Sequence, residues 1–265
     1  MCKGDMLNIV DVAKDNGVSL IGGGHCNQII TLYEDSVAII GAWDKMQGYT
    51  KVEFNYNVTQ DITQDFDINF VYNDQEYIDN DIKTIVDFWI AKTDEVLSDV
   101  IGYTNVDISR YSIELQNLMC DSWLYRFPNA DISITNAGGI RQDLFTGDID
   151  LADIVSMLPF ENYILELELT GAEIKDVISG LIIGGMTTVG GYYLSDGTPI
   201  DDQQEYTVLT TDYLYSQTSV NFSIYDPDPY NTNEHYRQPL IDYLKSLNTN
   251  SGDPLDNYLD YTSRW

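Results

Sequence analysis

The stretch Asn136-Ala137-Gly138-Gly139-Ile140-Arg141 decides how this sequence is interpreted. A β-type run at 132–135 ends where the glycines begin, so a strand leading into a turn is expected. Glycines at 138 and 139 permit positive φ and let the backbone approach a ligand closely. The Asn136 amide both donates and accepts hydrogen bonds, and the planar Arg141 fork suits phosphate or carboxylate. The stretch therefore predicts a ligand-binding turn.

The segments around this turn alternate between helix and strand patterns. Thr170-Gly171-Ala172-Glu173 has the spacing of a capping box, which predicts the start of a helix there. Apolar periodicity predicts further helices and strands. The expected helices are 113–126, 151–157 and 238–247, and the expected strands are 132–135, 164–169 and 206–213. This order predicts a mixed α/β or α+β domain of roughly 160 residues.

The first hundred residues have a different organisation. Residues 1–60 contain a short helical run at 8–16 and several short β-type runs separated by turn residues, and 57–75 is an acidic, polar connection. The pattern over 81–100 predicts a long amphipathic helix. Its apolar stripe consists of Ile82, Ile85, Val86, Trp89, Thr93, Val96, Leu97 and Val100. Such a helix is typical of a bridge between two structural units, and a core-packing role is compatible with that.

The charge balance excludes some classes of partner. The 265 residues include 43 acidic and 13 basic side chains, for a net charge of −30. Nucleic acids and anionic membrane surfaces are polyanions, so both are disfavoured. A small anionic ligand is not excluded, because local Arg and backbone N–H groups outweigh a distant background field. The acidic surface is interpreted mainly as a source of solubility.

Cysteine content and terminal sequences bear on the compartment. Cys2, Cys26 and Cys120 allow one disulfide, and the apolar setting of Cys120 predicts a buried thiol. The sequence shows neither an apolar signal-peptide core nor a run long enough to cross a bilayer. The sequons that begin at Asn57 and Asn221 fit secretion.

The motifs after the turn carry a resemblance to a known family. Leu158-Pro159-Phe160, the alternating run 163–169 and the Thr170-Gly171-Ala172-Glu173 helix start follow in order. This ordered set resembles the C-terminal domain of the 5′-nucleotidase family. The runs 206–213 and 239–247 look like that family's strand before its last binding loop and its closing helix. The resemblance implies a 5′-nucleotidase C-terminal-like α/β domain.

The beginning of the chain resembles the preceding domain of the same family. Leu20-Ile21-Gly22-Gly23-Gly24-His25-Cys26-Asn27 is similar to the last metal-site motif of its calcineurin-like metallophosphatase domain. The resemblance implies a metallophosphatase remnant with a partial β-sheet at 1–60, a linker with a long helix at 61–102 and the C-terminal-like domain at 103–265. An open sheet edge in the remnant predicts a homodimer or another assembly partner.

The resemblance also assigns roles to individual residues. In the substrate site, Asn136 and Arg141 match contacting residues, and Gly138 and Gly139 match close-approach glycines. Phe160 and Phe222 match the two aromatic residues that stack on the base, although the glycines before Phe222 are missing. The other matches are Asp228 for ribose or base, Arg110 for phosphate, and His25 as a metal ligand.

The resemblance implies nucleotide catabolism by a metal-dependent hydrolase, with nucleoside monophosphates or nucleosides as ligands. Hydrolysis in the family uses two divalent metal ions, such as zinc, which activate the attacking water. Only His25 matches a ligand position, so no catalytic residue is expected in this chain. Two hypotheses remain open: the substrate-binding portion of a 5′-nucleotidase-like phosphohydrolase, or a non-catalytic relative (a pseudoenzyme) in a larger assembly. An extracellular or cell-surface location is expected from the family and the sequons.

Overall fold

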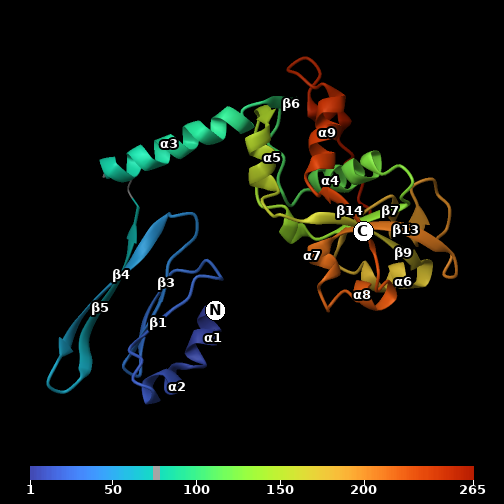
Figure 1. Ribbon diagram of the computed structural model, residues 1–265. Helices are drawn as coiled ribbons and strands as arrows, with labels where there is room; N and C mark the ends of the chain where they lie inside the picture. The colour runs from blue at the N-terminus through green and yellow to red at the C-terminus, as the bar shows by residue number, and fades with distance from the viewer. Residues whose placement is uncertain (74–77) are drawn as a thin grey trace. The chain divides into compact units, whose positions relative to one another are not determined.

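The computed structural model describes residues 1–73 and 78–265. They form two compact units, Met1–Val86 and Asp87–Trp265 (Figure 1). Both units combine helices with strands, and each has its own buried apolar cluster. The mixed α/β class predicted from the sequence is therefore confirmed.

The first unit is built on a three-stranded sheet of order β1-β3-β2. Strand β1 (Leu20–Gly22) is parallel to β3 (Val37–Gly41), and β2 (Ile30–Glu34) is antiparallel to it. Helices α1 (Lys3–Leu7) and α2 (Val10–Asp15) contribute to the same core. That core contains Met6, Val10, Ala13, Ile21, Ile30, Val37 and Ile39. The short strands predicted for this region are present.

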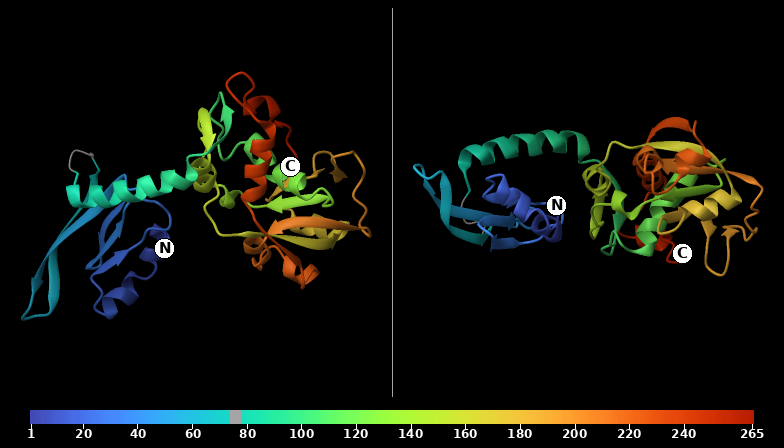
Figure 2. Two further views of the ribbon diagram at one scale, coloured as in Figure 1. Left: turned by 45° about the horizontal axis from the view of Figure 1, so that its top comes forward. Right: turned by 90° about the horizontal axis from the view of Figure 1, so that it is seen from below.

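A long antiparallel hairpin of β4 (Gly48–Asn57) and β5 (Ile62–Tyr72) follows, and Figure 2 shows it extending past the three-stranded sheet. The prediction of a polar connection over 57–75 is wrong for β5, and its last residues, 74 and 75, lie outside the described ranges. Apolar residues alternate along β5 (Phe66, Ile68, Phe70) with acidic and amide residues between them. This is the period of a strand, although the acidic content suggested a loop.

The predicted amphipathic helix is present as α3 (Asn80–Leu97). Val100, the last residue of the predicted stripe, belongs instead to strand β6 (Val100–Thr104). None of the α3 side chains is buried, so the core-packing interpretation of this helix is wrong. Its role as a linker stays a prediction.

The second unit contains a five-stranded mixed sheet of order β10-β7-β13-β9-β14. At its centre, β13 (Glu205–Thr211) runs parallel to β7 (Ile132–Thr135) and antiparallel to β9 (Tyr163–Thr170). The edge strands β10 (Ile182–Gly184) and β14 (Tyr230–His235) are antiparallel to their neighbours. The three predicted strands are confirmed, although the last ends at Thr211 and α7 (Asp212–Tyr215) follows it.

Helices cover both faces of this sheet, with α4 and α9 on one side and α6 and α8 on the other (Figure 1). The first face packs against α4 (Ile113–Arg126), α5 (Leu151–Met157) and α9 (Gln238–Leu247). The second face packs against α6 (Gly171–Val177) and α8 (Phe222–Tyr225). The predicted capping box opens α6: Thr170 Oγ1 accepts from the Glu173 N–H at 3.4 Å, and a Glu173 carboxylate oxygen accepts from the Thr170 N–H at 2.8 Å.

Smaller elements complete this unit. Strand β6 pairs with β8 (Gly147–Asp150), and β11 (Met186–Thr187) pairs with β12 (Tyr193–Leu194). Single 3₁₀ turns occur at η1 (Ala137–Gly139) and η2 (Leu255–Tyr258). Arg264 fixes the C-terminal segment through two hydrogen bonds of 2.7 Å to the Asp121 carboxylate. Cys120 is buried as predicted, and burial raises the pKa of its thiol to about 12.

Candidate functional site

A cavity of about 250 Å³ lies at one edge of the five-stranded sheet. It is lined by Asn136, Gly138, Gly139, Arg141, Phe160, Asn162 and Tyr213. The parallel strands β7 and β13 both end at this edge, and the antiparallel β9 begins there, since Thr211 pairs with Ile164. Three segments distant in sequence therefore meet at one place. Carboxyl ends of neighbouring parallel strands are a common location for ligand sites in α/β sheets.

The 136–141 turn is a single 3₁₀ turn held by backbone hydrogen bonds. The Gly139 N–H donates to the Asn136 carbonyl at 3.0 Å, and the Ile140 N–H donates to the Ala137 carbonyl at 3.1 Å. Neither Gly138 nor Gly139 has positive φ, so this turn does not use the left-handed conformation that glycine permits. A Cβ at Gly138 would lie 3.0 Å from Asn136 Nδ2, whereas one at Gly139 would lie 3.9 Å from Asn136 Oδ1. A methyl group at position 138 would therefore crowd the Asn136 amide, whereas one at 139 would not.

We expect Gly138→Ala to weaken ligand binding more than Gly139→Ala does. The methyl group at position 138 would crowd the Asn136 amide, while the methyl group at 139 makes an ordinary contact. A displaced hydrogen-bonding group typically costs about 0.5–1.5 kcal/mol of binding free energy. Calorimetric titration of both variants with AMP measures the difference, and equal losses would contradict this account.

The backbone of Arg141 is held on two sides. Its N–H donates to the Met157 carbonyl at 2.8 Å, and its carbonyl accepts from Arg110 Nη1 at 3.0 Å. Arg110 is itself fixed by a 2.8 Å bond from its N–H to the Asp143 carboxylate. Arg110 does not line the cavity, but it lies beside the turn and adds a second guanidinium there. The exposed Arg141 guanidinium lies 5.9 Å from the centre of the Phe160 ring.

Two aromatic side chains line the cavity. Phe160 is 42% exposed and Tyr213, in α7, is 50% exposed. The sequence predicted Phe222 instead of Tyr213, and this prediction is wrong because Phe222 is 0% exposed and belongs to the second apolar cluster of the sheet. A ring enclosed by core side chains has no face for a ligand. The signal that identifies Tyr213 is its place just after β13, whose end lies beside the 136–141 turn.

Asp228 also lies outside the cavity lining. It is exposed, and its N–H donates to the Asp226 carboxylate at 3.2 Å. The Asp226 carboxylate in turn accepts from the Glu168 N–H on β9 at 3.1 Å. These hydrogen bonds hold the segment that leads into β14. Asp226 and Asp228 therefore have a structural role.

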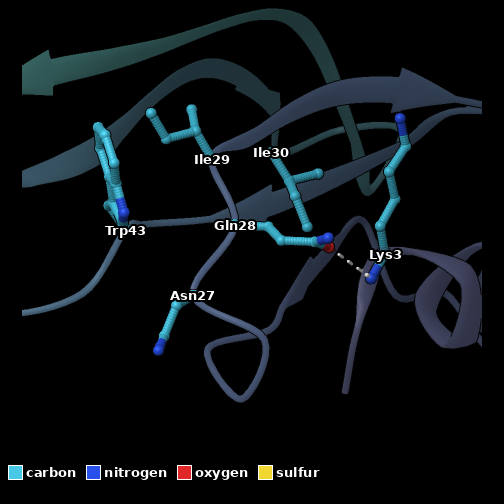
Figure 3. A pocket seen from close by; sticks show the side chains of 6 residues that line it. All are labelled: Lys3, Asn27, Gln28, Ile29, Ile30 and Trp43. Carbon is cyan, nitrogen blue, oxygen red and sulfur yellow. Dashed lines mark hydrogen bonds between the residues drawn. The ribbon is translucent and has the colours of Figure 1, made fainter. Parts of the chain in front are cut away.

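The loop that carries His25 lies in the first unit and is exposed. Beside it is an open hollow of about 430 Å³ (Figure 3), lined by Lys3, Asn27, Gln28, Ile29, Ile30 and Trp43. Lys3 and Trp43 lie at opposite ends of it, and a 3.5 Å hydrogen bond joins the Lys3 N–H to the Gln28 side chain. The lining has no set of converging charged groups that would define a ligand.

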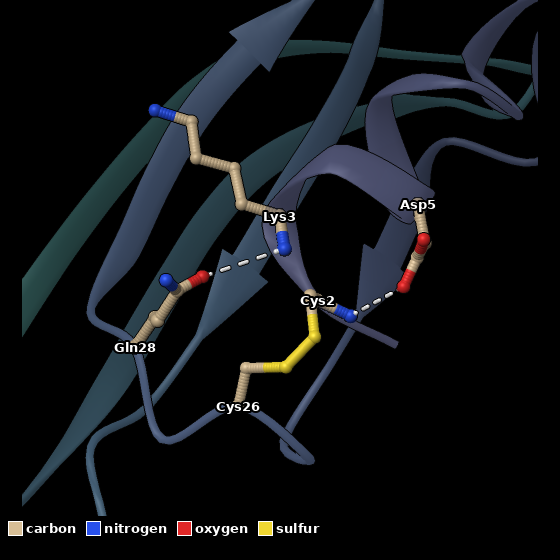
Figure 4. The surroundings of a disulfide bond; sticks show 5 residues. All are labelled: Cys2, Lys3, Asp5, Cys26 and Gln28. Carbon is tan, nitrogen blue, oxygen red and sulfur yellow. Dashed lines mark hydrogen bonds between the residues drawn. A yellow bond between two sulfur atoms is a disulfide. The ribbon is translucent and has the colours of Figure 1, made fainter.

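Cys26, next to His25, forms a disulfide with Cys2 (Figure 4). The two Cα atoms are 5.2 Å apart, within the ordinary range for a disulfide. The bond fixes the His25 loop to the start of α1, where the Cys2 N–H donates to Asp5 at 3.0 Å. Cys26 therefore has no thiolate to offer a metal.

The residues present do not fit a metal centre of the type that the resemblance implies. A two-metal site needs several Asp, His and Asn ligands that converge. Among residues 1–73 and 78–265, no group of three or more His, Cys, Asp and Glu side chains could hold an ion. His25 is a single exposed imidazole, and the described residues around it supply no converging ligands for a metal ion.

The fold and the cavity define a mixed α/β domain with a concave polar and aromatic site at its sheet edge. The model of the family "5′-nucleotidase, C-terminal domain" matches residues 90–192. Over these residues the chain is therefore similar to the 5′-nucleotidase C-terminal domain family.

Two curated relatives match most of this chain. Endonuclease YhcR of Bacillus subtilis is 24% identical over 88% of this chain and 21% of its own length. Cell wall protein Lmo0130 of Listeria monocytogenes is 24% identical over 80% of this chain and 33% of its own length. The chain thus spans only a fifth to a third of these relatives.

A solved structure shows the same fold. The 5′-nucleotidase precursor from Thermus thermophilus superimposes with a TM-score of 0.70 at 17% identity. The match covers 95% of this chain and 61% of that protein. At this identity the likeness describes the fold alone.

Proposed function

We propose that this chain is the substrate-binding portion of a 5′-nucleotidase-like phosphohydrolase and recognises a nucleoside monophosphate. The cavity formed by Asn136, Arg141, Phe160 and Tyr213 is the observation that carries this proposal. Its volume, about 250 Å³, is below the roughly 300–1,000 Å³ of pockets for drug-sized ligands. It suits a nucleobase with part of its ribose better than a dinucleotide.

Each lining group has a matching part of such a ligand. The exposed faces of Phe160 and Tyr213 suit a flat base, since stacking of a base on an aromatic ring contributes about 1–3 kcal/mol. The Asn136 and Asn162 amides offer donors and acceptors to base or ribose. The Arg141 guanidinium suits the phosphate, and its local charge overcomes the acidic background.

We expect Phe160→Ala to lower the affinity for both AMP and adenosine by about 1–3 kcal/mol, because both ligands contain the base. Titration calorimetry with the two ligands measures this. A wild-type chain that binds neither ligand at millimolar concentration would overturn the proposed function. A Phe160→Ala variant with wild-type affinity would remove Phe160 from the site.

The alternative proposal is a non-catalytic relative that serves as a structural or binding subunit. The exposed His25 and the lack of a metal-binding cluster among the described residues favour it. The proposals differ in one measurable result: metal-dependent release of phosphate from AMP by the natural gene product. Release supports the phosphohydrolase, and binding without release supports the subunit.

We further propose that residues 1–60 are the end of a metallophosphatase domain, that 61–102 link it to the next domain, and that the protein lies outside the cytoplasm. The Thermus likeness extends over 95% of the chain and so includes the first unit. The Cys2–Cys26 disulfide suits an oxidising compartment, and one relative is called a cell wall protein. Residues 1–73 and 78–265 contain no helix with the length and apolar character to cross a membrane.

The first unit also favours an assembly partner. Within the described residues, β1 pairs with β3 and leaves its other edge unpaired. An open edge strand is a template for a further strand. We propose that another segment or a second copy of the chain pairs there, and a monodisperse monomer in light scattering would exclude the second copy.

A further inference from the structure

Phe160 and Asn162 belong to the short connection between α5 and β9, and a second segment holds its backbone. The residues His235, Tyr236 and Arg237, where β14 passes into α9, form what we call the Phe160 clamp. The Phe160 N–H donates to the Tyr236 hydroxyl at 3.2 Å. The Tyr236 N–H donates to the Asn162 carbonyl at 3.0 Å. The buried Tyr236 thus fixes both ends of the 160–162 connection, one through its side-chain hydroxyl and the other through its backbone N–H.

Arg237 is the centre of the clamp, and its side chain is 13% exposed. Its Nη2 atom donates to the Phe160 carbonyl at 3.1 Å and to the Glu161 carboxylate at 2.9 Å. Its Nε atom donates to His235 Nδ1 at 3.2 Å. The other imidazole nitrogen, His235 Nε2, lies 3.3 Å from the Glu161 carboxylate. One planar guanidinium therefore orders three partners, which a lysine ammonium cannot reproduce.

We propose that Arg237 and His235 are positioning residues that hold the Phe160 wall of the cavity in its ligand-binding orientation. The inference rests on the proposed function, because it assigns the clamp a role in binding. Neither Arg237 nor His235 lines the cavity, so both act through the 160–162 backbone. A preorganised wall saves the ordering cost that a mobile loop would add to binding.

The clamp depends on a neutral His235. Burial, and then the charge of Arg237, lower the pKa of His235 from its ordinary value of 6.5. Glu161 and Asp212 oppose this shift, and the Tyr163 and Tyr236 rings flank the imidazole. At pH values between the lowered pKa and 6.5, His235 binds more protons in the unfolded chain than in the folded one. The neutral His235 therefore contributes its full share to folding stability above pH 6.5, and this share is lost as the pH falls through the lowered pKa. A proton on Nδ1 removes the acceptor for Arg237 and places two cations together.

Two measurements test the clamp. Hydrogen–deuterium exchange of segment 158–164, without ligand, should accelerate in Arg237→Gln and to a smaller extent in Arg237→Lys. AMP affinity at neutral pH should fall about tenfold in Arg237→Gln, the loss expected for a charge-assisted hydrogen bond, and less in Arg237→Lys. Arg126→Gln is the matched control, because it removes an ion pair with the β14 residue Glu234 that does not touch this connection. Unchanged exchange or affinity in Arg237→Gln would overturn the proposal.

The pH profile separates positioning from simple structural support. Adenosine is the ligand for this arm, because the AMP phosphate itself titrates at about pH 6. Adenosine affinity of the wild-type chain should fall as the pH is lowered from 7.5 through the depressed pKa of His235, and that of His235→Gln should stay constant over the same range. The same dependence of adenosine affinity on pH in the wild-type chain and in His235→Gln would overturn the role of His235. A wild-type chain that binds no ligand, with exchange in segment 158–164 still altered by Arg237→Gln, would instead refute the proposed function.

Discussion

Phe222→Ala is expected to lower the free energy of unfolding by about 3–5 kcal/mol, the usual range when a buried Phe is truncated to Ala. Phe222 is fully buried and packs with Leu214 and Val208 in one apolar cluster. Removal of its ring leaves a cavity that the surrounding side chains cannot fill. Chemical denaturation monitored by circular dichroism measures the change.

A milder substitution at the same position distinguishes a core residue from a stacking residue. The conservative variant Phe222→Leu should keep enough stability for titration and bind AMP with wild-type affinity. Tyr213→Ala is the matched comparison, since its ring is half exposed: its stability should change by only about 0.5 kcal/mol, and its AMP affinity should fall. A large loss of affinity in Phe222→Leu with none in Tyr213→Ala would return the stacking role to Phe222.

Tyr213 lines the cavity where the sequence predicted Phe222, and this difference shows what local sequence leaves undetermined. Thr211 caps α7 by accepting from the Leu214 N–H at 3.1 Å, so the chain turns into a helix directly after β13. Asn221 then adopts a left-handed conformation before α8, and Phe222 points into the core. The missing glycines in this loop indicated that its backbone would differ. They could not indicate which aromatic residue would reach the cavity.

The turn at 136–141 was more predictable, because its signal is local. A β-type run followed by Asn-Ala-Gly-Gly specifies a strand end and a tight turn, and both are present. That Phe160 and Asn162 would lie beside it depends on the pairing of β9 with β13 and of β13 with β7. Those pairings are set by burial over the whole sheet. The clamp residues His235 and Arg237 cannot be found from local sequence for the same reason, because their contacts with the 160–162 connection also depend on how distant segments of the sheet pair.

Arg141→Ala should reduce the affinity for AMP by about 1.5–3 kcal/mol, the range of a hydrogen bond to a charged group, and leave adenosine affinity nearly unchanged. The guanidinium lines the cavity, and with residues 1–73 and 78–265 it forms one long hydrogen bond, of 3.4 Å to the Gly138 carbonyl. It is therefore available for a phosphate, and only AMP has one. Calorimetry with the two ligands at low salt gives both affinities.

The control for this prediction has to match the change in charge, because the chain carries a net charge of −30. Arg126→Ala removes one positive charge from an exposed ion pair with Glu234. Any loss of AMP affinity in this variant therefore measures the effect of the overall charge of the chain. If the phosphate contacts Arg141 directly, Arg141→Ala loses far more AMP affinity than Arg126→Ala does, and Arg141→Lys recovers part of it. Equal losses in the two alanine variants, or an equal loss for adenosine, would show that Arg141 does not contact the phosphate. Arg110→Ala tests the neighbouring guanidinium: a selective loss for AMP would mean that two arginines share the phosphate.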